Sequence, residues 1–111
     1  MTKAKEFRVS IRELLELLSS KEKQLAYYAN VPKANVASEL VCMWFDDMFY
    51  PETDLFKSSF KLDEIKQLTL FNNAYERLTK KLPDNFEAYH ANREWNQVMV
   101  LARQTLAHIQ W

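Results

Sequence analysis

The sequence predicts an all-α protein that folds as a single compact bundle of about five helices. Three observations support this class. Apolar residues recur every three or four positions along most of the chain, and no segment alternates between apolar and polar residues for long enough to form a strand. Prolines and capping residues divide this pattern into segments of helical length. Because no linker or repeat interrupts the pattern, we expect residues 1–111 to form one domain.

Residues 11–29 fit either one helix or two. Ser10 and Glu13 have the spacing of a capping box, and Ser19 and Glu22 repeat that spacing. A single helix would place Glu22 at the centre of its apolar face, whereas a break near Ser19 would place this carboxylate at the N-terminus of a second helix, where it is favourable. We therefore favour two helices.

The third helix is expected to begin at Asn35 or near Pro32, and to end at Pro51. Proline breaks a helix beyond its first turn, and asparagine is a common N-terminal cap. The inward face of this helix is expected to consist of Ala37, Leu40, Val41, Trp44, Phe45 and Met48.

Two longer helices are expected to follow. The first extends from about Leu62 to Leu82, where Pro83 ends it, and the second begins at about Asn92. The second has the most regular apolar face in the chain, formed by Trp95, Val98, Met99, Ala102, Leu106 and Ile109.

The helix expected over residues 62–82 also carries an outward strip that is basic with one apolar member. Such a strip is either a solvated face or a contact for an acidic partner. Its members are Lys66, Leu70, Arg77 and Lys81.

Composition excludes several classes of function. The chain has 15 basic and 15 acidic residues, so its formal net charge is zero, which argues against a dedicated binder of polyanions. It contains no glycine, which phosphate-binding loops, dinucleotide-binding motifs and nucleophile elbows need. A single cysteine fits a reducing compartment, so we expect a cytoplasmic protein. The longest apolar run, residues 40–45, is far too short to cross a membrane.

No combination of residues predicts catalysis, a metal site or a cofactor. Cys42 is flanked by apolar residues, which supply neither a base nor an orienting group. Glu87 and His90 form one E-x-x-H, whereas a di-iron bundle needs two. Asp46 and Asp47 are adjacent, but they do not face each other on a helix, and no histidine lies near them. We therefore expect a non-enzymatic protein.

Residues 25–40, LAYYANVPKANVASEL, resemble the spacing of a helix-turn-helix motif. The resemblance implies a trihelical N-terminal half in which Lys33 and Ser38 contact nucleic acid. The other two positions that would face the groove are alanines, and Glu39 adds repulsion, so few groups could read bases or hold phosphates. A nucleic-acid-binding regulator is therefore our alternative hypothesis. The positions that match the motif are Ala29, Asn30, Val31, Val36 and Leu40.

A shorter segment, FYPETD at residues 49–54, resembles the cluster of aromatic residues, proline and acids that DNase-colicin immunity proteins present to their toxins. The similarity covers six residues, and the chain lacks the acidic excess of that family. We therefore take the segment as an illustration of surface chemistry and not as a family assignment.

Our principal hypothesis is a small helical protein that acts by contact with another protein, as a regulator, an adaptor or an immunity-like inhibitor. Aromatic residues make up 14% of the chain, more than a small core readily buries, and such residues are enriched in interfaces. A homodimer is also compatible with this surplus. We expect the helix around Trp44 to bury that residue, and a patch on its outer side and end to meet the partner. The predicted contact residues are Met43, Asp46, Phe49, Tyr50 and Phe56.

Overall fold

A computed structural model describes residues 3–31 and 35–111 of the chain, and these residues form helices without any strand. The all-α prediction is confirmed. Two of the segments are short, the helix α4 and the 3-10 helix η1, and the five longer ones match the predicted number. In chain order the elements are α1 (Lys3–Ser19), α2 (Lys21–Asn30), α3 (Val36–Phe45), α4 (Asp54–Ser59), α5 (Leu62–Thr79), η1 (Phe86–Ala91) and α6 (Arg93–His108).

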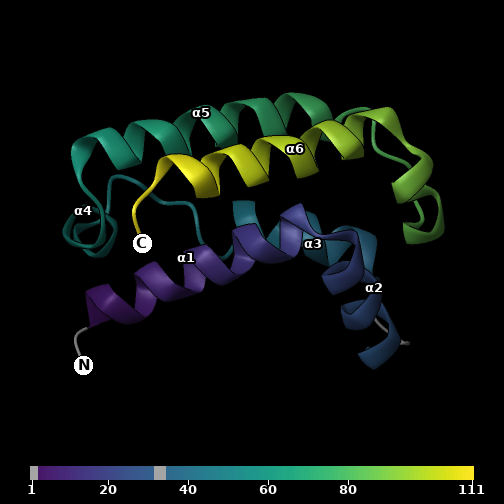
Figure 1. The fold of residues 1–111 in the computed structure, drawn as a ribbon, viewed down its shortest axis with the longest axis horizontal. Helices are drawn as coiled ribbons and strands as arrows, with labels where there is room; N and C mark the ends of the chain where they lie inside the picture. The colour runs from purple at the N-terminus through teal and green to yellow at the C-terminus, as the bar shows by residue number, and fades with distance from the viewer. Residues whose placement is uncertain (1–2, 32–34) are drawn as a thin grey trace.

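The helices are arranged in two layers (Figure 1). The antiparallel pair α5 and α6 forms one layer, and α1 and α3 form the other, with α2 extending from the end of α1. α1 packs against α6 and α4, and α5 packs against α6. The first turns of α1 and the C-terminal tail lie at the end of the molecule where α4 is found (Figure 1).

The boundaries of the first two helices differ in part from the sequence expectations. The break is confirmed, but the cap expected at Ser19 is wrong. Ser20 caps α2 by accepting a hydrogen bond from the backbone N–H of Lys23 at 3.2 Å, whereas the Ser19 hydroxyl donates to the carbonyl of Glu16. The capping box expected at Ser10 is wrong, because Ser10 lies inside α1 and its hydroxyl donates to the carbonyl of Glu6. The added turns of α1 contain Phe7, whose ring packs on rings of the α4 region, and this contact holds the longer helix against α4.

The third helix begins as expected but ends earlier. The Asn35 side chain caps α3 by accepting from the N–H of Ser38. α3 ends at Phe45, so the expected end at Pro51 is wrong. The chain turns there because the ring of Phe49 folds back onto Trp44, with 5.3 Å between ring centroids and an interplanar angle of 15°.

Eight of the fifteen aromatic residues of the chain are buried in the core. Trp44 and Trp95 are fully buried, as expected from their helical faces. Their neighbours Tyr75 and Tyr89 are buried with hydroxyl groups that donate to backbone carbonyls of α3. Phe56 is fully buried as well, so its expected outward position is wrong. The aromatic surplus therefore reflects the composition of the core more than that of the surface.

The buried amide of Gln24 attaches α2 to the rest of the fold. Its Nε2 donates to the carbonyls of the last turn of α1, at 2.9 and 3.1 Å. Its Oε1 accepts from Trp95 Nε1 at 3.0 Å and lies 2.8 Å from His90 Nε2, which therefore donates. Burial, followed by the nearby charge of Lys21, lowers the pKa of His90. His90 thus has a role in packing, and Glu87, its E-x-x-H neighbour, accepts a hydrogen bond from a tyrosine hydroxyl of α2.

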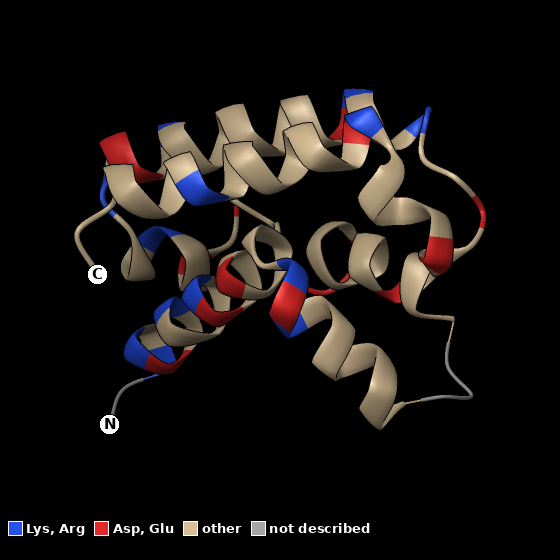
Figure 2. Cartoon of the chain, turned by 45° about the vertical axis from the view of Figure 1, so that its right-hand side comes forward, with Lys and Arg blue, Asp and Glu red and all other residues tan. Residues whose placement is uncertain are grey.

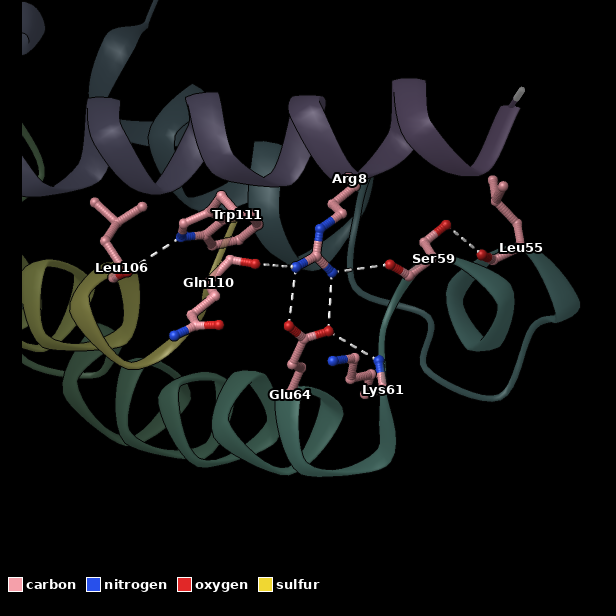
Figure 3. A network of polar contacts seen from close by, with 8 residues as sticks. All are labelled: Arg8, Leu55, Ser59, Lys61, Glu64, Leu106, Gln110 and Trp111. Atoms are coloured by element: carbon pink, nitrogen blue, oxygen red, sulfur yellow. Dashed lines mark hydrogen bonds and ion pairs between the residues drawn. The ribbon is translucent and has the colours of Figure 1, made fainter. Parts of the chain in front are cut away.

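Arg8 joins four segments that are distant in sequence (Figure 3). Its guanidinium makes two parallel hydrogen bonds to the Glu64 carboxylate in the first turn of α5, at 2.8 and 2.9 Å. It also donates to the carbonyl of Ser59, at the end of α4, and to that of Gln110 in the C-terminal tail. We call this group the Arg8 clamp. Because the Arg8 hydrogen bond stabilises the charged carboxylate, the pKa of Glu64 lies below its ordinary value.

Candidate protein-contact surface

The segment that follows α3 brings together four carboxylates. We define the acidic loop as residues 46–55, which connect α3 to α4 and include the first two residues of α4. The loop contains no lysine or arginine. Its carboxylates are all on exposed residues, namely Asp46, Asp47, Glu52 and Asp54.

The inner side of the acidic loop is fixed to the core by Phe49. The ring of Phe49 stacks on Trp44, and its edge meets the ring of Phe56 at 5.4 Å between centroids. Trp44 is itself held by a hydrogen bond from its Nε1 to the Asn72 side chain of α5, at 3.0 Å. The loop therefore rests on a continuous aromatic base that extends from α3 to α4 and α5.

Short-range hydrogen bonds fix the outer side of the loop. The hydroxyl of Tyr50 donates to the carbonyl of Asp46 at 2.6 Å. The hydroxyl of Thr53 donates to the carbonyl of Tyr50 at 2.8 Å and accepts from the N–H of Phe56, which caps α4. The exposed carboxylates thus extend from a backbone that is already ordered, so little conformational entropy would be lost when a partner binds.

No ion pair among the described residues offsets the charges of the acidic loop. Within residues 3–31 and 35–111, the ion pairs are Arg8–Glu64, Arg12–Glu16 and Arg93–Glu94, so none of the four loop carboxylates is paired. Asp46 and Asp47 also lie at the C-terminus of α3, whose last turn contains no basic residue. That end of a helix carries partial negative charge, so each aspartate there is destabilising by about 0.3–1 kcal/mol.

Two apolar side chains are exposed among the carboxylates. Tyr50 is 44% exposed and Leu55 is 40% exposed. The surface therefore combines unpaired negative charge with exposed apolar area that is easily desolvated. This combination is common where proteins bind each other. In the part of the chain that the structure describes, no three histidine, cysteine, aspartate or glutamate side chains are grouped so that they could hold a metal ion.

The contact residues predicted from the sequence differ in how deeply they are buried. Asp46 and Tyr50 are exposed on the acidic loop, whereas Met43 and Phe49 are half-buried and pack against the core. Phe56 supports the loop from below and is not on the surface. The predicted contact residues did not include Asp47, Glu52, Asp54 and Leu55, although Glu52 and Asp54 lie within the segment FYPETD. The run of four acids without a basic residue between positions 46 and 55 was the signal that could have found them.

The nucleic-acid hypothesis has a weaker structural basis than the acidic loop. Lys33 lies outside the described residues, and Ser38 is exposed on α3, with its hydroxyl 3.9 Å from the sulfur of Cys42. Ala29, which a helix-turn-helix motif would place between its helices, is exposed, and Leu25 is 43% exposed.

The chain was compared with protein-family models, curated proteins and solved structures. None of the three comparisons finds a match. The six-residue resemblance to colicin immunity proteins is therefore a local similarity of surface chemistry. Among the described residues, no helix is both long enough and apolar enough to span a bilayer.

Proposed function

We propose that this protein acts without catalysis, by binding another protein, and that the acidic loop is its contact surface. The observation that carries the proposal is the group of four unpaired carboxylates on a loop whose backbone is fixed from both sides. Charges in such a place reduce the stability of the isolated chain, and a complementary partner would relieve this cost.

The proposed partner is a protein with a basic surface. Lysine or arginine side chains would pair with the carboxylates, and an apolar group would cover Tyr50 and Leu55. A protein that blocks a basic site of its partner would be a regulator or an immunity-like inhibitor, and one that only connects two proteins would be an adaptor. We also propose a cytoplasmic location, which the single free cysteine supports.

Affinity capture from host lysate at low salt tests the proposal. We expect a stoichiometric partner to be retained by the wild-type chain, lost on Tyr50→Ala and released as salt rises, because exposed charge pairs are screened. Tyr50→Phe is the matched control, since it keeps the ring but removes the hydroxyl that bonds to the Asp46 carbonyl. A partner retained equally by the wild type and Tyr50→Ala would place the contact surface elsewhere.

A nucleic-acid-binding regulator that uses residues 25–40 is the second proposal, and only the sequence resemblance favours it. A mobility shift on duplex DNA distinguishes the two. The principal proposal predicts no binding at physiological salt, because the net charge is zero and acids lie within α3 and directly after it. Sub-micromolar binding that is lost on Lys33→Glu would favour the nucleic-acid proposal instead.

A further inference from the structure

The outer side of α5 carries a stripe of three exposed residues spaced seven apart: Asp63, Leu70 and Arg77. Seven residues correspond to nearly two helical turns, so the three side chains lie on one side of the helix. Leu70 is 56% exposed at the centre of the stripe. Neither charged member belongs to an ion pair among the residues that the structure describes.

We propose that this stripe pairs with the same stripe of a second copy of the chain, about a two-fold axis at Leu70. In such an antiparallel pair Leu70 meets its own counterpart, and Asp63 of each copy faces Arg77 of the other. The stripe is therefore complementary to itself, as a two-fold interface requires. Favourable interaction with the helix dipole explains why an acid begins α5 and a base ends it, but it does not explain the exposed leucine midway between them.

The surface beside the stripe is suited to the same partner. A hollow of about 480 Å³ lies between α5 and α6 and is lined by Arg77, Val100 and Leu101 among others. A second hollow, which includes Leu70, shares Leu101 with the first, so the furrow continues along the helix pair. Val100, in this furrow, is 44% exposed.

The charge distribution favours a second copy over an acidic peptide. No charged residue occurs in residues 67–75 of α5 or 95–102 of α6, and Figure 2 shows the middle of both helices without charge. An acidic peptide in the furrow would meet Arg77 at one end but Asp63 at the other. A second copy in antiparallel orientation gains both contacts, and Lys66, which lies on the same outward strip, faces the uncharged Ala74 of the other copy.

The size of the face indicates a weak dimer. α5 has 18 residues, so at 1.5 Å per residue the face is about 27 Å long, and two packed helices make it about 20 Å wide. The pair would bury about 1,100 Å² in total, at the low end of specific interfaces. We therefore expect dissociation in the micromolar range.

Sedimentation equilibrium over a dilution series tests the pairing. We expect the wild type to dimerise, and Arg77→Asp and Asp63→Arg each to weaken the dimer by roughly 10- to 100-fold, because each turns two attractive pairs into two repulsive ones. Lys23→Asp, an exposed position on α2, makes the same change of charge as Arg77→Asp and should leave the dimer unchanged. Circular dichroism should show that all these variants are folded, since the substituted residues are exposed.

Combining the two substitutions makes the test specific. A mixture of Asp63→Arg chains with Arg77→Asp chains should form a heterodimer, because both cross-pairs are again opposite in charge. The double variant Asp63→Arg/Arg77→Asp should dimerise with itself, and its net charge of zero excludes general attraction as the cause. A wild type that stays monomeric at every concentration, or a double variant that stays monomeric while the wild type dimerises, would overturn the proposal.

A disulfide cross-link tests the register. In a Cys42→Ala background, Leu70→Cys should form an intermolecular disulfide in a glutathione redox buffer, because the two cysteines meet at the axis. Arg77→Cys in the same background should not, since its two copies would be about 21 Å apart along the helices and a disulfide needs Cα atoms within about 7 Å. Cross-linking at residue 77 as fast as at residue 70 would rule out this register.

Discussion

Removing the Glu64 carboxylate should destabilise the protein far more than removing an exposed carboxylate. Its side chain is 8% exposed, and it forms two charge-assisted hydrogen bonds with Arg8, whose side chain is 22% exposed. It also accepts from the N–H of Lys61 at the start of α5. Exposed pairs contribute about 0–1 kcal/mol, whereas breaking a buried pair costs about 3–5 kcal/mol. For this partly buried pair we expect Glu64→Ala to lower the free energy of unfolding by about 2–3 kcal/mol.

The assay for the Arg8 clamp is urea denaturation followed by circular dichroism, with Glu16→Ala as the matched control. Glu16 pairs with Arg12 on the surface of α1, with side chains 39% and 52% exposed, so its loss should change stability by about 0.5 kcal/mol or less. Equal effects of Glu64→Ala and Glu16→Ala would refute the structural role of the clamp.

The clamp also predicts a dependence of stability on pH. The folded-state pKa of Glu64 is lowered, mainly by the hydrogen bond from Arg8, so its contribution is present above the unfolded pKa of about 4.3. As pH falls below that value and through the folded pKa, the carboxylate is protonated and the contribution is lost. In this pH window the free energy of unfolding of Glu64→Gln should therefore fall less steeply than that of the wild type. Equal slopes for the two proteins would contradict the contribution of Glu64 to stability.

Three further predictions follow from the core. Trp44→Ala should lower the free energy of unfolding by about 3–5 kcal/mol, because it empties a fully buried site and removes the partner of Asn72; a loss below 1 kcal/mol by denaturant titration would contradict this packing. Gln24→Leu leaves the N–H groups of His90 and Trp95 without their acceptor, so it should lower the free energy of unfolding by about 1–3 kcal/mol for each of them. An unchanged free energy of unfolding by denaturant titration would contradict the role of Gln24 in packing. The pKa of Tyr27 is raised to about 12, first by its hydrogen bond to Glu39, so Glu39→Gln should lower it in a spectrophotometric titration, and an unchanged pKa would contradict that bond.

Local patterns in the sequence predicted the fold class well, because helical faces and caps depend on neighbouring residues. The break before α2 and the cap at Asn35 are of this kind. The early start of α1 and the early end of α3 were not predictable in this way. They depend on Phe7 packing against α4 and on Phe49 folding back onto Trp44, contacts that exist only in the folded chain.

The candidate surface was predicted only in part for the same reason. Helical periodicity placed Asp46 and Tyr50 on the outward face of the expected third helix, and both are exposed although α3 ends at Phe45. The burial of Phe56 could not be foreseen, because it lies in a short helix without a repeating pattern and its environment comes from α1 and the acidic loop. The clamp formed by Arg8 and Glu64 joins residues far apart in the sequence, so no local spacing could reveal it.

The most direct test of the proposed contact surface compares stability and binding in one variant, Asp46→Asn/Asp47→Asn. Removing two unpaired charges from the C-terminus of α3 should raise the free energy of unfolding by about 0.5–2 kcal/mol. The same variant should retain at most about one tenth of the amount of partner that the wild type retains at low salt. Glu6→Gln/Glu13→Gln, which removes two exposed charges from α1, should retain the partner in full. An Asp46→Asn/Asp47→Asn chain that binds the partner as well as the wild type would contradict the acidic loop as the contact surface.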